Sequence, residues 1–139
     1  MKKILLIIAA LALMGAGVGL YMYNKPHDKM ESAKADKEID AKSLYDLYED
    51  DEAAADQAFL GKILEVTGIV REIHRGGEKD NFIILETDGL MGAVKCQLDH
   101  LTDHVKLDQI KESQKVTLKG HCTGYLMDVI LDRCVIVKV

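Results

Sequence analysis

The side chains that could do chemistry in this chain of 139 residues are three cysteines, a pair of histidines and a few scattered cationic and aromatic residues. His100 and His104 stand four residues apart, the spacing at which two metal ligands share one face of a helix. Leu101-Thr102-Asp103 separates them, so the glutamate of the hydrolytic zinc motif is missing. We therefore expect a surface pair and no metal. Because no serine-nucleophile, phosphate-loop or dinucleotide motif is present, we expect no catalytic residues, no enzyme activity and no cofactor.

Cys96, Cys122 and Cys134 each fall in a predicted strand. Antiparallel partners have a constant sum of positions, so pairing Cys122 with Cys134 centres a turn on residue 128, within a stretch where a turn is expected. We predict a disulfide between these two cysteines, since an exported domain lies where disulfides persist. The competing pair is Cys96 with Cys134, and buried reduced thiols are the other alternative. Three is an odd number, so at least one thiol stays unbridged or pairs between chains.

A weak ligand-binding set can also be named. Proteins that bind single strands stack bases on exposed aromatic rings above a basic groove. Between residues 61 and 139 the only aromatic residues are Phe82, a candidate for the core at the start of a strand, and Tyr125, in the last turn. The predicted binding set is therefore Tyr125 with the cations Arg71, Arg75, Lys95 and Lys119. Scattered surface charge is the alternative, because this region carries eleven cationic against twelve acidic residues, and a phosphate-backbone binder is expected to show a basic face.

The first element along the chain is an apolar run from residue 4 to 23. It follows Lys2-Lys3 and contains no charge. A helix of that length is roughly 30 Å long, the thickness of a bilayer core. We predict a transmembrane helix within residues 1–24, with the amino end inside and the rest of the chain outside the cytoplasm. Secretion after signal cleavage near Gly15-Ala16-Gly17 is the alternative. The Gly15 and Gly19 spacing leaves open an assembly role through the membrane helix.

Residues 25–40 are polar and charged, and we predict a flexible tether. Residues 41–60 then show apolar side chains at helical spacing, preceded by a capping-box pattern at Ser43. We expect one amphipathic helix packed on the following domain. The segment 36–60 carries nine acidic residues against two lysines, and we interpret this charge as a solvated helix face.

From residue 61 to the end the apolar pattern changes to a period of two, which indicates strands. Gly68 interrupts the first strand, where a glycine can supply a bulge or a sharp bend. The predicted strands cover residues 63–73, 81–87, 90–98, 115–123 and 129–139, with a short helix within 99–113. Three strands, a connecting helix and two more strands is the order of a five-stranded OB-fold barrel. The predicted fold class is therefore mainly β, with a preceding amphipathic helix and a membrane helix.

Several blocks of this sequence resemble the tRNA_anti-like family of bacterial OB-fold proteins. The blocks are residues 44–56, 61–70, 94–96, 119–124 and 131–136. The resemblance implies an OB barrel behind a packed helix, on an exported or lipid-anchored protein, with nucleic-acid binding inferred from the fold. This chain departs from the lipid-anchored members because no cysteine precedes Cys96.

The leading functional prediction is a non-enzymatic binding module of the cell envelope, anchored in the bacterial inner membrane with its barrel in the periplasm. Its partner would be a protein or a small ligand. The alternatives are an OB-fold protein that binds single-stranded nucleic acid, and a structural or assembly protein that acts through the membrane helix.

Overall fold

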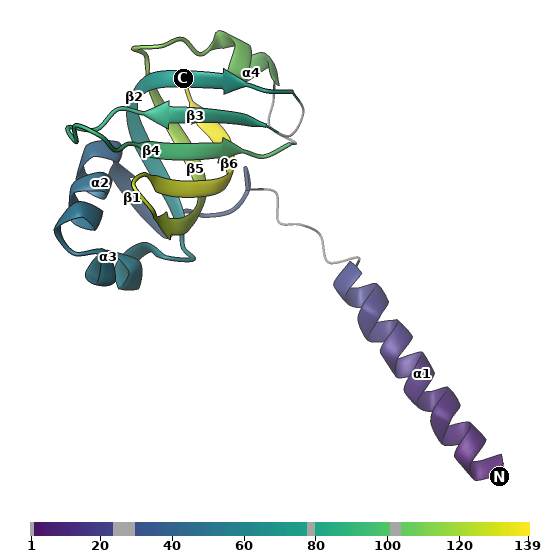
Figure 1. The fold of residues 1–139 in the computed structure, drawn as a ribbon. Coiled ribbons are helices and arrows are strands. Elements are labelled where there is room, and N and C mark those ends of the chain that lie inside the picture. Colours follow the sequence, from purple (N-terminus) through teal and green to yellow (C-terminus); the bar gives the residue numbers. More distant parts are fainter. Residues whose placement is uncertain (1, 24–29, 78–79, 101–103) are drawn as a thin grey trace.

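A computed structural model describes residues 2–23, 30–77, 80–100 and 104–139. Its elements, in chain order, are α1 (Lys2–Tyr23), β1 (Lys37–Asp40), α2 (Ala41–Asp50), α3 (Glu52–Phe59), β2 (Ile63–Arg75), β3 (Asn81–Leu85), β4 (Val94–Leu98), α4 (His104–Gln109), β5 (Lys115–Tyr125) and β6 (Val129–Lys138). Figure 1 shows the strands gathered into one body and α1 extending away from it.

The predicted five-stranded barrel is confirmed. Its strand order is β2-β3-β4-β6-β5, and β5 pairs again with β2, so the sheet closes on itself. The short helix α4 lies between the third and fourth barrel strands along the chain, as the OB order requires. Closure leaves no unpaired edge among these five strands, and the long strand β2 can serve both neighbours because it spans thirteen residues.

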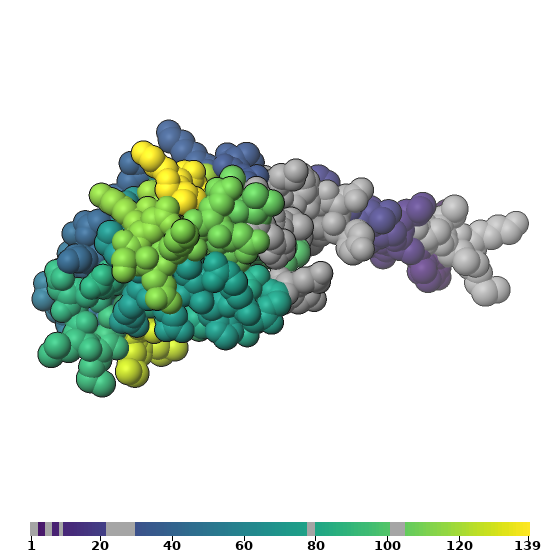
Figure 2. All heavy atoms as spheres, turned by 90° about the horizontal axis from the view of Figure 1, so that it is seen from above, coloured from purple at the N-terminus to yellow at the C-terminus, as the bar shows by residue number. Residues whose placement is uncertain are grey.

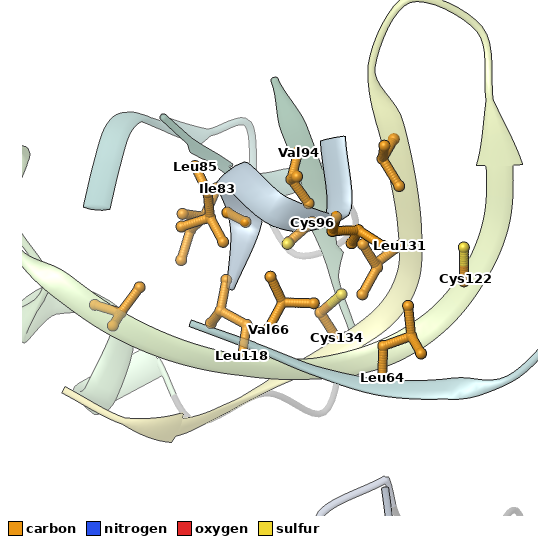
Figure 3. Close-up of a cluster of buried hydrophobic side chains, with 14 of the residues drawn as sticks. Leu64, Val66, Ile83, Leu85, Val94, Cys96, Leu118, Cys122, Leu131 and Cys134 are labelled. Atoms are coloured by element: carbon orange, nitrogen blue, oxygen red, sulfur yellow. The ribbon is translucent and has the colours of Figure 1, made fainter. Parts of the chain in front are cut away.

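Alternation along the strands directs one set of side chains into the barrel (Figure 3). In β3 and β4 the alternate residues are fully or almost fully buried, while Phe82, Ile84, Lys95 and Gln97 between them are half-buried and point outward. The barrel core contains Leu64, Val66, Val70, Ile83, Leu85, Val94, Cys96, Val116, Leu118, Leu131 and Cys134.

The cysteines lie inside this core, and no disulfide joins them. The register places Leu131 opposite Cys122, so it does not favour the predicted Cys122–Cys134 bridge. Cys122 Sγ instead lies 3.3 Å from the Tyr48 hydroxyl. Burial and a hydrogen bond with the Cys96 thiol raise the pKa of Cys134 well above its usual value. Of the two pairs considered, the structure therefore brings together the competing pair, Cys96 and Cys134. The Cys122–Cys134 bridge stays a prediction.

The single helix expected over residues 41–60 is two helices. Asp51 stands between α2 and α3 in an extended conformation, with φ −154° and ψ 93°. Its carboxylate accepts a hydrogen bond of 3.0 Å from the Ala54 amide, which caps α3. The start of α2 also differs, because Asp40 rather than Ser43 is its cap residue. Asp51 caps the first amides of α3, so two helices form where the apolar spacing suggested one continuous helix.

The tether predicted over residues 25–40 is also wrong for its described part. β1 pairs in parallel with β2 along the outside of the barrel, and Met30 is buried. A side-chain hydrogen bond helps to hold this polar segment against β2: the Asp36 carboxylate accepts from the Ile63 amide at 2.8 Å. Residues 25–29 lie outside the described part of the chain.

Gly68 does not mark a bulge. Its pairing with β5 is regular, and the irregularity in β2 lies between Val70 and Glu72. A Cβ atom at position 68 would lie 2.8 Å from the Ala41 Cβ. The glycine is therefore needed because the first turn of α2 packs directly on this strand.

The N-terminal helix α1 exposes its described apolar side chains. Ile7, Leu13 and Leu20 are 60%, 74% and 65% exposed. Among the residues that the structure describes, no helix combines the length and the apolar character needed to cross a membrane. The membrane span at residues 4–23 thus stays a prediction.

Candidate ligand-binding face of the barrel

Tyr125, the aromatic residue of the predicted binding set, packs against other aromatic side chains of the fold. Its ring stacks on Tyr48 at a centroid distance of 5.6 Å and meets Tyr45 edge-on at 6.0 Å. A hydrogen bond with Tyr125, together with burial, raises the pKa of Tyr45 to about 12. Tyr125 therefore joins the barrel to α2.

Lys119 and Arg75 are likewise used within the fold. Lys119 is only 7% exposed, and its Nζ donates to the backbone oxygens of Glu31 at 3.0 Å and Ala33 at 2.8 Å. The Arg75 guanidinium donates to the backbone oxygen of Leu107 at 3.3 Å, within α4. Figure 2 shows this contact region, where the green residues of α4 lie beside the teal residues of β2. Lys119 and Arg75 thus hold segments of the chain in place. Arg71 is exposed and lies at the bulge of β2.

Lys95 is the predicted site residue that does lie beside an outward-facing ring. Its Nζ is 4.2 Å from the centroid of the Phe82 ring, a cation–π contact. The His74 imidazole also stacks on Phe82, at 4.5 Å with an interplanar angle of 13°. His74, Phe82 and Lys95 come from β2, β3 and β4, and we name them the Phe82 platform.

The strand register explains why these three side chains meet. His74 is the direct partner of Phe82 in the antiparallel pair of β2 and β3, and Lys95 is the partner of Ile84, diagonal to Phe82. Outward side chains at such positions are within contact distance across a sheet. The His74 side chain is 43% exposed, and its Nε2 lies 3.6 Å from Asp80 Oδ2. The result is a half-buried aromatic surface flanked by an ammonium and an imidazole.

The platform continues across the sheet into a hollow of about 430 Å³. Gln97 is the partner of Phe82 on β4, and the next strand, β6, contributes Asp132 and Arg133 to the hollow. The full lining is Gln97, Leu98, Asp99, His100, Asp132 and Arg133. A ligand that stacks on Phe82 could therefore reach a polar recess on the same face.

A sequence family described as tRNA_anti-like matches residues 1–136 of this chain. The chain belongs to the tRNA_anti-like family. It is thus an OB-fold binding domain of that family. None of the curated proteins matches it.

Among solved structures, this tRNA_anti-like chain is similar to a "putative nucleic acid-binding lipoprotein" from Klebsiella pneumoniae subsp. pneumoniae. The TM-score is 0.58 at 14% identity, over 72% of this chain and 91% of that one. This likeness shows the shared fold. The asparaginyl-tRNA synthetase of Entamoeba histolytica, in complex with asparaginyl-adenylate, has a TM-score of 0.42 at 16% identity, over 60% of this chain and 23% of that one. An OBody bound to hen egg-white lysozyme has a TM-score of 0.41 at 15% identity, over 58% of this chain and 86% of that one.

Sequence reasoning missed His74 and Phe82 in this tRNA_anti-like protein. The strand Phe82-Ile83-Ile84-Leu85 is apolar throughout, so its alternation cannot be seen from hydropathy alone. A usable signal exists in β4, where Lys95 and Gln97 alternate with apolar residues and so identify the outward face. Pairing that strand with β3 would have placed Phe82 outward.

The two histidines do not share one helix in the described structure. His104 begins α4, whereas His100 precedes it and lies with its Nδ1 3.0 Å from Asp99 Oδ1. Within the described ranges no group of three or more potential ligands could hold a metal ion. His100 instead lines the hollow beside Arg133.

Proposed function

We propose that this protein binds single-stranded nucleic acid on the outer face of β3 and β4, with Phe82 stacking on a base. The observation that carries the proposal is the half-buried Phe82 ring in contact with His74 and Lys95. A base that stacks on this ring would displace the Lys95 ammonium, whose long side chain can turn toward a phosphate. OB folds bind single strands by stacking bases on such rings, and a nearby cation adds a contact for the phosphate backbone. Membership of the tRNA_anti-like family and the description of the Klebsiella protein as nucleic acid-binding agree with this choice.

The charge of the barrel indicates how this binding would work. Residues 61–139 are nearly neutral, and two of the predicted cations are used within the fold. Affinity would then come from stacking more than from phosphate contacts, and its dependence on salt would be shallow. A single phosphate contact changes the logarithm of the binding constant by about −0.7 per logarithm of salt concentration. A protein or small-ligand partner stays the alternative for the same face.

Replacing Phe82 by alanine tests the platform. Loss of one base–aromatic stack costs about 1–3 kcal/mol, which is a decrease of about 5- to 150-fold in affinity. The measurement is fluorescence anisotropy of labelled single-stranded DNA and RNA at low and moderate salt. Phe82→Tyr keeps the ring and should keep binding. Leu126→Ala, an exposed site in the β5–β6 turn, should leave it unchanged. Equal affinity of Phe82→Ala and the unaltered protein would refute the platform.

We further propose that residues 4–23 anchor the barrel in the bacterial inner membrane, with the barrel on the periplasmic side. The support is the uncharged apolar run itself and the exposure of its described side chains. A phosphatase fused after Val139 should be active in cells, and a fluorescent reporter that matures only in the cytoplasm should stay dark. The reverse pattern would contradict export. Recovery of a shortened, soluble chain would indicate signal cleavage instead of an anchor.

A further inference from the structure

Strand β6 has a β-bulge in its pairing with β4, next to the Phe82 platform. The β4–β6 register advances from Cys96 opposite Leu131 to Leu98 opposite Cys134, so β6 has one residue more than β4 in this interval. Two consecutive residues, Asp132 and Arg133, are consequently exposed. Bulges of this kind re-aim side chains and are frequent beside functional sites.

The backbone at this bulge is strained. Arg133 has φ 50°, in the left-handed region that residues other than glycine rarely adopt. The Asp132 carboxylate supports this conformation, because its Oδ1 accepts a hydrogen bond of 2.8 Å from the Arg133 amide. A non-glycine residue held in this region is a reason to look for a function of its side chain.

The bulge lies in line with the platform. His74, Phe82 and Gln97 are successive partners across β2, β3 and β4, and β6 is the next strand. Two strand spacings, about 10 Å, separate Phe82 from the bulge. A single strand that runs across the sheet from Phe82 would therefore bring a following base over the hollow.

We infer that the hollow lined by Gln97, Asp132 and Arg133 is a base-recognition subsite that prefers guanine; this inference rests on the proposed function. A carboxylate only accepts hydrogen bonds, and a guanidinium only donates them. A base that uses both side chains fully would therefore present two adjacent donors to the Asp132 carboxylate and an acceptor pair to Arg133. Asp132 Oδ1 keeps a second lone pair for this contact beside its bond to the Arg133 amide.

Guanine is the base that meets both requirements. Its N1–H and N2–H₂ groups are adjacent donors that fit a carboxylate, and its O6 and N7 are the acceptors that arginine contacts most often. Adenine, cytosine and thymine each offer a single donor group and cannot fill both carboxylate positions. Asp99 also lines the hollow, but its side chain is only 17% exposed and Asp132 is exposed, so we assign recognition to Asp132.

The test compares short oligothymidylates that carry one central guanine, adenine or cytosine. The unaltered protein should bind the guanine oligonucleotide about 5- to 150-fold more tightly, the discrimination typical of a bidentate contact. Asp132→Asn should lose this preference and keep the weaker binding of the other oligonucleotides. Its amide oxygen can still accept from the Arg133 amide, so the fold should persist. Asp88→Asn, an exposed acid in the β3–β4 loop, is the matched control. It loses only an exposed ion pair with Lys42 and should leave oligonucleotide binding and the guanine preference unchanged.

Arg133→Gly is the second variant, because glycine adopts the left-handed backbone without strain. It should melt at an equal or higher temperature and yet lose the guanine preference. Titration of guanosine monophosphate against adenosine monophosphate examines the hollow without the platform. Equal binding of all oligonucleotides, or a preference that survives Asp132→Asn, overturns the subsite while the proposed function stands. If no oligonucleotide binds, selective guanosine monophosphate binding supports the subsite alone, and its absence overturns both.

Discussion

Substitution of Gly120 by alanine is expected to lower the free energy of unfolding by about 1–3 kcal/mol, as overpacking of a dense core does. Gly120 lies on β5, where an added Cβ would be 2.4 Å from Cys134 Sγ and 3.0 Å from the backbone oxygen of Asp132. Cys134 is fully buried and hydrogen-bonded with the Cys96 thiol, so a shift of its sulfur would disturb the packed core. Urea unfolding followed by circular dichroism measures the change.

The control for Gly120→Ala is the same substitution in a Cys134→Ala background. Removal of the sulfur creates space for the new methyl group, so the double variant should be less destabilised than the sum of the single variants predicts. The expected coupling is about 0.5–3 kcal/mol. If Gly120→Ala unfolds at the same urea concentration as the unaltered protein, the packing described around Cys134 is wrong.

Tyr48→Ala is expected to have the largest effect on stability, about 3–5 kcal/mol, in the range of aromatic-to-alanine substitutions in cores. The Tyr48 side chain is 1% exposed and lies where α2, α3 and the barrel meet. Its ring stacks on Tyr125 and lies 6.1 Å from the Phe59 ring, and its hydroxyl is within hydrogen-bond distance of Cys122. The alanine variant would lose the packing that holds both helices to the barrel.

Tyr48→Phe is the matched control, because it keeps the ring and removes one hydrogen bond of about 0.5–1.5 kcal/mol. Leu47→Ala, at a neighbouring position that is 45% exposed, should stay within about 0.5 kcal/mol of the unaltered protein. A loss of equal size in Tyr48→Phe and Tyr48→Ala would contradict a packing role for the ring.

Alkaline pH provides a second readout of Tyr48. Burial and the contact with Cys122 raise the pKa of Tyr48 above its usual value, so the folded protein keeps the phenol neutral. The unfolded chain ionises near its ordinary pKa of about 10. The stability that depends on neutral Tyr48 is therefore fully present below pH 10 and falls as the pH rises above it. Tyr48→Phe should make the melting temperature less sensitive to this rise.

The barrel and the order of its strands could be predicted from the amino-acid sequence alone. Period-two alternation is a local consequence of burying one face of each strand, so β2, β4, β5 and β6 could be recognised without knowledge of their partners. The connecting helix between the third and fourth strands then restricted the fold to the OB order. The low basic charge and the absence of catalytic motifs are also properties of the sequence alone.

Tertiary contacts decided which side chains are available to a ligand. Lys119 and Arg75 look like surface cations in the sequence, but both donate hydrogen bonds to backbone oxygens of distant segments. Phe82 looks like a core residue, and only the register with Gln97 and His74 turns its ring outward. The β6 bulge at Asp132 and Arg133 arises from a mismatch with β4, which no single strand reveals. Hydropathy is a property of one residue, whereas exposure and partnership depend on which strand lies beside it.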